Sequence, residues 1–196
     1  MSRSATEPRL NRLRETLASR VRIGVDAGPP LLRAGVLVPL LPGGEGLELL
    51  FTRRTETVLT HKGQISFPGG QREEGDDTLV ETALRETSEE IGLEPHRVEV
   101  LGELDDVFTA VTGFVITPVV GWISEDPGPL RVAPTEVERL IRVPIRRLLD
   151  PAVHTSEERV FNGETHTIHY FRVGEDVIWG ATGRIVHQFM SIWQMD

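Results

Sequence analysis

The stretch that most constrains the fold is a glycine turn that leads into an acidic helix. Residues 64–67 (QISF) have the composition of a short strand, and they stop at the turn 68–70 (PGG). A helix is expected from about residue 77 to residue 91, because apolar residues recur there with helical spacing. Gly92 follows as a residue that can end the helix in a left-handed conformation. This order predicts a helix that is positioned beside a sheet by a tight loop.

The remaining patterns predict a sheet with helices on it. Further strands are expected at residues 34–41, 47–53, 98–107, 113–123, 153–161, 166–173 and 177–179, and further helices at 134–141, 145–149 and 182–193. Asn162-Gly163 is a strong hairpin signal between two of these strands. Strands and helices interleave irregularly, which favours the α/β (α+β) class, with a mixed β-sheet sandwiched between helices. His166 and His169 are expected to be structural and not ligands, and the core is expected to contain Trp122, Trp179 and Trp193.

The N-terminal residues 1–23 are expected to add an amphipathic helix to one domain that spans residues 1–196. Thr6 can cap a helix over residues 8–21, and Pro8 suits its first turn. Its apolar stripe would consist of Leu10, Leu13, Leu17 and Val21. Packing of this stripe on its own domain is favoured, and a homodimer interface is the alternative.

Charge and composition argue against several classes of function. The 196 residues carry 30 acidic and 21 basic side chains, and the formal charge of −9 does not favour binding to nucleic acid or to an anionic membrane. Because the chain has no cysteine, it has no disulfides, thiolate catalysis or zinc–thiolate sites. No apolar run approaches the ~20 residues that span a bilayer. The first residues lack the apolar core of a signal peptide, so we expect a cytoplasmic protein.

Three glutamates crowd the acidic helix beside its apolar face. Glu86, Glu89 and Glu90 lie within about 100° of one another on a helical wheel, and Arg85 is one turn before Glu89. A solvated acidic face is the ordinary explanation for such a cluster taken alone. The preceding glycine turn favours another, because backbone without side chains can approach a ligand closely. Carboxylate and carbonyl oxygens suit Mg²⁺ or Mn²⁺, so the pattern predicts a divalent cation that also binds a substrate phosphate.

The acidic helix and its turn also resemble the Nudix box, G-x5-E-x7-R-E-U-x-E-E-x-G-U, in which U is bulky and apolar. Gly70, Asp77 and residues 85–93 (RETSEEIGL) carry this resemblance. The chain departs from it by one extra residue in the first spacing, by Asp77 as the first acid and by Thr87 at a U position. The resemblance implies a Nudix fold and hydrolysis of a nucleoside diphosphate linked to another moiety. Asp77 could instead only cap the helix.

Upstream residues resemble, within that family, the motif of coenzyme A pyrophosphatases, LLTxR(S/A)xxxRxxxGxxxFPGG. Residues 50–55 (LFTRRT) and 61–70 (HKGQISFPGG) match it, with departures at Phe51, Thr55 and Leu59. The resemblance implies that coenzyme A, or its oxidised or acyl forms, is split into 4′-phosphopantetheine and adenosine 3′,5′-bisphosphate. Two alternatives stay open. One is a Nudix hydrolase of an ADP-ribose or nucleoside triphosphate type of substrate, and the other is a non-catalytic Nudix-fold module that senses a nucleotide.

The acidic core would carry the chemistry. Glu86 and Glu90 are the first expected metal ligands, because they are i, i+4 on one helix face. The backbone carbonyl of Gly70 is a further ligand by resemblance. Glu89 would either bind a second cation or act as the base that takes a proton from the attacking water. Arg85 would orient a glutamate by a charge-assisted hydrogen bond.

The substrate is expected to contact the residues just before this helix. The backbone of Gly69 and Gly70 can approach the ligand closely. A 3′-phosphate needs a basic partner, for which the candidates are Arg53, Arg54, Lys62 and Arg72. For each of these taken alone, a solvated surface side chain is the favoured interpretation. His61 would either donate a hydrogen bond near the phosphates or be only a loop residue.

Overall fold

The computed structural model describes residues 3–25, 31–55, 63–109, 113–161 and 163–195. The elements, in chain order, are α1 (Arg3–Ser19), β1 (Leu32–Gly43), β2 (Gly46–Arg54), β3 (Ile65–Ser66), β4 (Gly69–Gln71), α2 (Leu79–Ile91), η1 (Pro95–Arg97), β5 (Glu99–Glu103), β6 (Val107–Thr109), β7 (Phe114–Trp122), β8 (Val137–Pro144), α3 (Ile145–Leu148), β9 (His154–Phe161), β10 (Glu164–Val173), β11 (Asp176–Ile178) and α4 (Gly180–Met195).

Within the described residues, the main sheet has eight strands and is mixed. Its central path runs β3-β2-β1-β7-β5, while β4 pairs with β1, β6 with β7 and β8 with β2. Strands β1 and β7 are parallel, and their other pairings are antiparallel. A second, antiparallel sheet of order β11-β10-β9 contains the predicted hairpin, in which Phe161 lies opposite Glu164. The mixed sheet predicted from the sequence is confirmed.

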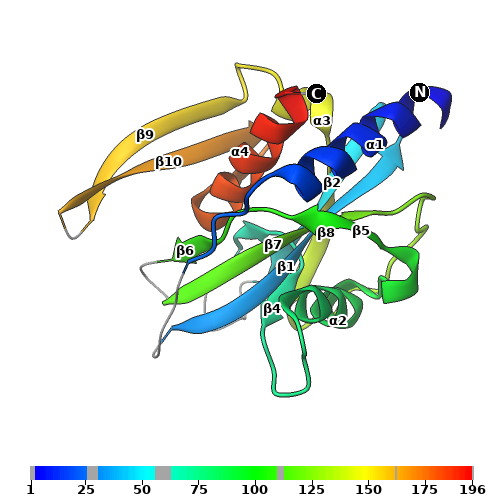
Figure 1. Cartoon of the computed structure of the whole chain (residues 1–196), viewed down its shortest axis with the longest axis horizontal. Coiled ribbons are helices and arrows are strands. Elements are labelled where there is room, and N and C mark those ends of the chain that lie inside the picture. Colours follow the sequence, from blue (N-terminus) through cyan, green and yellow to red (C-terminus); the bar gives the residue numbers. More distant parts are fainter. Residues whose placement is uncertain (1–2, 26–30, 56–62, 110–112, 162, 196) are drawn as a thin grey trace.

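Helices cover both faces of the main sheet (Figure 1). Helix α2 packs on one face, where Ala83 and Ile91 are buried against Leu37, Leu50 and Val119. Helices α1 and α4 cover the other face, and their part of the core includes Leu10, Leu13, Leu49, Phe51, Phe189 and Trp193. Strand side chains alternate between the two faces, so neighbouring residues of β2 belong to different halves of the core. The predicted sandwich of helix, sheet and helix is confirmed.

Two predicted elements were wrong. Residues 134–141 were expected to be helical, but Val137–Pro144 form strand β8, which pairs with β2 so that Thr52 lies opposite Leu140. Long-range pairing with β2 outweighs the local helix preference of this segment. The turn at residues 68–70 is also partly a strand, because Gly69–Gln71 form β4 opposite residues 34–36 of β1.

The N-terminal helix begins earlier than its sequence signals suggested. It runs from Arg3 to Ser19, so that Pro8 lies inside it, and Val21 falls beyond its end with 88% of its surface exposed. Leu10, Leu13 and Leu17 are buried in the core of the same chain. The favoured alternative, packing on its own domain, therefore holds for this stripe, and a homodimer would have to use another surface. No helix in the described part of the chain is long and apolar enough to cross a membrane.

Three histidines join the second sheet to α4. His154 on β9 and His169 on β10 approach within 3.0 Å between Nε2 and Nδ1, and His187 on α4 stacks on His169 with ring centroids 3.8 Å apart. Burial lowers the pKa of all three, and the neighbouring His187 and His154 help to lower the pKa of His169 to about 4. The cluster therefore packs in its neutral form.

Replacing His169 with phenylalanine should make stability less sensitive to acid. An unfolded histidine takes up a proton near pH 6.5, whereas His169 in the fold stays neutral to about pH 4. The wild type therefore loses the stability contributed by His169 as the pH falls through this window. The unfolding free energy of His169→Phe minus that of the wild type should therefore be about 2 kcal/mol larger at about pH 4.5 than at about pH 7.5. Urea denaturation at the two pH values measures it. His96→Phe, at an exposed histidine of η1, should show no such gain. A pH-independent difference for His169→Phe would contradict the prediction.

Candidate functional site

The acidic helix α2 is fixed at both ends. Thr78 is its N-cap and forms a reciprocal capping box with Glu81, so the cap is Thr78 and not Asp77 as considered from the sequence. Gly92 ends the helix with φ 69°, as predicted, and its N–H donates to the Ser88 carbonyl at 2.9 Å. These caps satisfy backbone groups that the helix cannot pair itself, and they set the direction in which the glutamates point.

Arg85 is the centre of a hydrogen-bond network with Asp76. Its Nε and Nη2 donate to the two Asp76 carboxylate oxygens at 3.0 and 2.9 Å. Asp76 is 6% exposed and also accepts from the Thr82 hydroxyl and the Glu73 N–H. The Arg85 guanidinium holds the pKa of Asp76 well below its usual range.

The acid paired with Arg85 is Asp76, whereas the motif alignment had taken Asp77 as the first acid of the box. Asp77 is exposed, and its backbone makes its hydrogen bonds: its N–H donates to a Glu81 carboxylate oxygen at 2.7 Å, and its carbonyl accepts from Arg72 at 3.1 Å. Counting five residues after Gly70, as the usual pattern does, leads to Asp76. The spacing from Gly70 therefore indicated Asp76 in the sequence. The spacing of seven residues before Arg85 indicates Asp77 instead.

Replacing Asp76 with asparagine should weaken both the fold and the turnover. Hydrogen bonds to a charged partner contribute about 2 kcal/mol, so the unfolding free energy should fall by about that amount. Turnover should fall about 10- to 100-fold, as for residues that orient a catalytic group from behind. Asp77→Asn is the matched control and should leave both quantities unchanged. A larger loss in the Asp77 variant, in thermal unfolding or steady-state kinetics, would restore the original alignment.

Glu86 lies against the glycine turn. Its carboxylate accepts from Arg85 Nη1 at 3.1 Å, and its side chain is 19% exposed. A Cβ atom added to Gly70 would lie 2.5 Å from the Glu86 carboxyl carbon, so only glycine leaves room for this carboxylate. Burial raises the pKa of Glu86. Gly70 and Glu86 are thus brought together as expected.

Glu90 is the most buried of the three glutamates, at 5% exposure. It accepts from the Gly69 N–H at 3.2 Å and forms an ion pair with Arg54 at 3.6 Å. Burial raises the pKa of Glu90 to about 7, and the negative charge of Glu86 adds to the rise. A carboxyl group in this position carries its charge only at a cost, which a bound cation would offset.

Glu89 faces solvent. Its side chain is 61% exposed, and both carboxylate oxygens lie 3.3 Å from Arg85 Nη1. Arg85 therefore contacts Asp76, Glu86 and Glu89 at once. As they stand, no three acidic or histidine side chains among the described residues converge closely enough to hold a metal ion.

The donor set nevertheless fits a hard divalent cation. Three carboxylates lie along one side of α2, and the glycine turn before it lies so close to Glu86 that a Cβ atom added to Gly70 would be 2.5 Å from the Glu86 carboxyl carbon. Oxygen donors of this kind are what Mg²⁺ and Mn²⁺ bind in proteins. A cation at this position would replace Arg85 as the partner of Glu86 and Glu89.

The basic residues that were expected near the substrate lie in different parts of the structure. Arg54 contacts Glu90, whereas Arg53 points to the other face of β2 and pairs with Asp176 at 3.4 Å and Glu138 at 3.2 Å. Arg72 donates to the backbone carbonyls of Asp76 and Asp77, so it holds the loop before α2. His61 and Lys62 lie outside the described residues.

Comparisons with known proteins agree with this geometry. The model of the NUDIX domain family matches residues 31–162. A Photorhabdus laumondii protein named uncharacterized Nudix hydrolase NudL is 34% identical over 156 residues, which cover 79% of this chain and 81% of that protein. Nudix hydrolase 15, mitochondrial, of Arabidopsis thaliana is 38% identical over 167 residues, 82% of this chain and 58% of that protein.

Solved structures show the same fold. A MutT/nudix family protein from Enterococcus faecalis superposes with a TM-score of 0.59 over 99% of this chain and 75% of its own, at 15% sequence identity. A Caenorhabditis elegans Ap4A hydrolase in a binary complex gives a TM-score of 0.50 over 61% of this chain and 84% of its own, also at 15% identity. Likeness at this level of identity concerns the fold alone.

Proposed function

Because the chain belongs to the Nudix hydrolase family, and is therefore a hydrolase that acts on phosphoanhydride bonds of nucleoside diphosphate derivatives, we propose that its substrate is coenzyme A. The products are then 4′-phosphopantetheine and adenosine 3′,5′-bisphosphate. Oxidised and acyl forms of coenzyme A carry the same diphosphate and belong to the proposed substrate class.

One observation supports this substrate most directly. The stretch that resembles the coenzyme A pyrophosphatase motif contacts the glutamates of α2. Arg54, near its start, pairs with Glu90, and Gly69, near its end, donates its N–H to the same carboxylate. The subfamily-like stretch is therefore part of the same site as the general Nudix motif.

Nudix hydrolases generally use divalent metal ions, and we assign Mg²⁺ or Mn²⁺ to Glu86, Glu89, Glu90 and the backbone carbonyl of Gly70. Such an ion, when bound, neutralises phosphate charge and lowers the pKa of a bound water. To contact it, Glu86 and Glu89 would turn away from Arg85. Arg85 would stay in place because Asp76 holds two of its nitrogens.

The chain's own residues can then divide the reaction between them. Glu89 is the most exposed of the three glutamates, so, where it does not bind a second cation, it can take the proton of the attacking water. The water oxygen forms a bond to one phosphorus of the diphosphate, and the bond from that phosphorus to the bridging oxygen breaks. The leaving group departs as a phosphate monoester. Arg54 and the Gly69 N–H keep Glu90 pointed at the site.

The test is a substrate panel with pure protein and Mg²⁺. Coenzyme A, NADH, ADP-ribose and dATP are incubated separately, and products are identified by mass. Adenosine 3′,5′-bisphosphate formed mainly from coenzyme A is the expected result. Faster turnover of another compound would replace coenzyme A as the substrate, and binding without turnover of any compound would favour a nucleotide-sensing module.

A homodimer and a cytoplasmic location stay predictions.

A further inference from the structure

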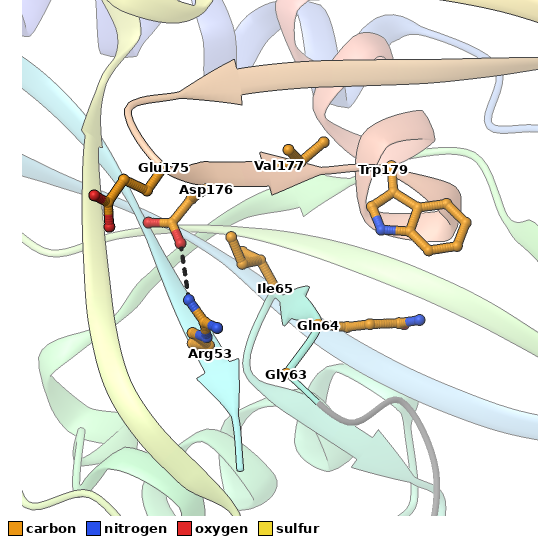
Figure 2. A pocket seen from close by; sticks show the side chains of 8 residues that line it. All are labelled: Arg53, Gly63, Gln64, Ile65, Glu175, Asp176, Val177 and Trp179. Atoms are coloured by element: carbon orange, nitrogen blue, oxygen red, sulfur yellow. Dashed lines mark hydrogen bonds and ion pairs between the residues drawn. The ribbon is translucent and has the colours of Figure 1, made fainter. Parts of the chain in front are cut away.

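A pocket lies between β3 and β11, at the end of β2 whose other face carries the Arg54–Glu90 pair. This pocket of about 370 Å³ is lined by Arg53, Gly63, Gln64, Ile65, Glu175, Asp176, Val177 and Trp179. Figure 2 shows Trp179 and Gln64 at one end of it and Arg53 with Asp176 at the other. Its volume is within the range of about 300–1,000 Å³ that small-molecule sites occupy. None of the roles proposed above uses it.

Trp179 was expected from the sequence to be a core residue, but the structure places it at the surface. Its side chain is 45% exposed, and Val177 beside it is 38% exposed, so an apolar surface faces the pocket. A large aromatic side chain left exposed at a pocket commonly marks a place where a ligand binds. This exposure needs a reason, because Trp193 is 3% exposed in the core.

The indole is held on a rigid junction. Trp179 is the single residue between β11 and α4, and its carbonyl accepts from the Gly183 N–H at 3.2 Å. Gly180 after it has φ 65°, and a Cβ at Gly183 would lie 2.4 Å from the His169 carbonyl oxygen, so α4 sits tightly on β10. Tyr170 on β10 lies nearly parallel to the indole, at 13° and 6.3 Å between centroids. The ring is therefore preorganised for stacking.

The charges of the pocket argue against a phosphate. The Arg53 guanidinium pairs with Asp176 and Glu138, and Arg139 also donates to Asp176, at 2.6 Å. Glu175 adds a further exposed carboxylate at the rim. Carboxylates thus balance the arginines, so a second anion would gain little. A neutral planar ring with an amino group fits better, because carboxylates accept hydrogen bonds from such groups.

Two neighbouring residues of β2 connect the pocket with the glutamates of α2. Arg53 and Arg54 end strand β2, and consecutive side chains point to opposite faces, so one lines the pocket and the other pairs with Glu90. Ile65 in the pocket and Gly69 on Glu90 are four residues apart, about 13 Å of extended chain. A nucleotide can span this distance by passing the end of β2.

We propose that this pocket binds the nucleobase of the substrate, with the base stacked on Trp179. The inference rests on the proposed nucleotide chemistry and adds a residue that determines specificity. Arg53 then supports the pocket through Asp176 and does not read the 3′-phosphate.

Binding is tested without metal, so that turnover plays no part. Tryptophan fluorescence is followed in EDTA while adenosine 5′-monophosphate or ribose 5-phosphate is added; the two ligands differ only in the base. Adenosine 5′-monophosphate should quench the wild type and Trp122→Phe, but not Trp179→Phe. Ribose 5-phosphate should quench none of them. Equal quenching by both ligands, quenching that survives in Trp179→Phe, or no quenching at all would overturn the proposal.

Kinetics provide the second readout. With the nucleotide that the wild type hydrolyses fastest, Trp179→Ala should raise KM about tenfold and change kcat less than about twofold, because base stacking is a binding interaction. Trp179→Phe keeps an aromatic face and should recover most of the loss. An unchanged KM in Trp179→Ala would overturn the proposal. Failure to hydrolyse coenzyme A would overturn only the proposed substrate, since adenosine 5′-monophosphate binding needs neither coenzyme A nor turnover.

Discussion

Replacing Glu90 with glutamine is expected to lower kcat about a thousandfold without unfolding the protein. Glutamine has the same shape and can still accept the Gly69 N–H, but it cannot supply the negative charge that a divalent cation requires. Loss of a charge contact worth several kcal/mol in the transition state corresponds to a factor of this size. Steady-state turnover with Mg²⁺ is the measurement.

Although Glu90→Gln should lower kcat, it should not lower the stability of the metal-free protein. Burial raises the pKa of Glu90 to about 7, so the ionised carboxylate destabilises the metal-free fold above that pH. Glu90→Gln removes this cost, and its unfolding temperature in EDTA at about pH 8 should equal or exceed that of the wild type. Added Mg²⁺ should then raise the unfolding temperature of the wild type more than that of the variant.

Glu94→Gln is the matched control, because Glu94 is exposed just after the same helix. It should keep both turnover and the response to Mg²⁺. If Glu90→Gln kept most of the activity, Glu90 would not be a metal ligand. If it unfolded in EDTA, the buried carboxylate would be a structural group.

Local signals were enough to predict the acidic helix and its end. Gly92 adopts the left-handed conformation that its position after the helix suggested, and β9 and β10 pair as the predicted hairpin requires, with Phe161 opposite Glu164. Turns and caps depend on neighbours in sequence, so their residues identify them directly. The apolar spacing of α2 likewise predicted which face would be buried.

Features that depend on distant residues could not be predicted in the same way. Strand β8 exists because β2 offers it a partner some 90 residues earlier in the chain, and its sequence alone reads as a helix. The choice between Asp76 and Asp77 depends on which carboxyl group the loop turns toward Arg85. The exposure of Trp179 depends on how the second sheet sits beside β3. Residue type could not reveal any of these.

Replacing Gly70 with alanine should remove most of the activity at little cost in stability. Its backbone does not need the left-handed conformation, so alanine brings no backbone strain, and the atoms that its Cβ would meet are the carboxylate atoms of Glu86 at 2.5 to 2.7 Å. That carboxylate ends a flexible side chain, which can rotate away. A displacement of about 1 Å at a catalytic group can cost about a hundredfold, so kcat/KM should fall by at least that factor.

Gly69→Ala separates this effect from general damage to the turn. At Gly69, φ is 147°, and a Cβ would lie 2.4 Å from the Gly35 carbonyl oxygen and 2.5 Å from Val36 Cα, both of which are backbone atoms of β1. This neighbour cannot move away, so Gly69→Ala should lower the unfolding temperature strongly, whereas Gly70→Ala should shift it little. If Gly70→Ala stayed active, Glu86 would not need its position beside the turn. If both variants unfolded alike, the loss of activity in Gly70→Ala would reflect damage to the sheet and would say nothing about Glu86.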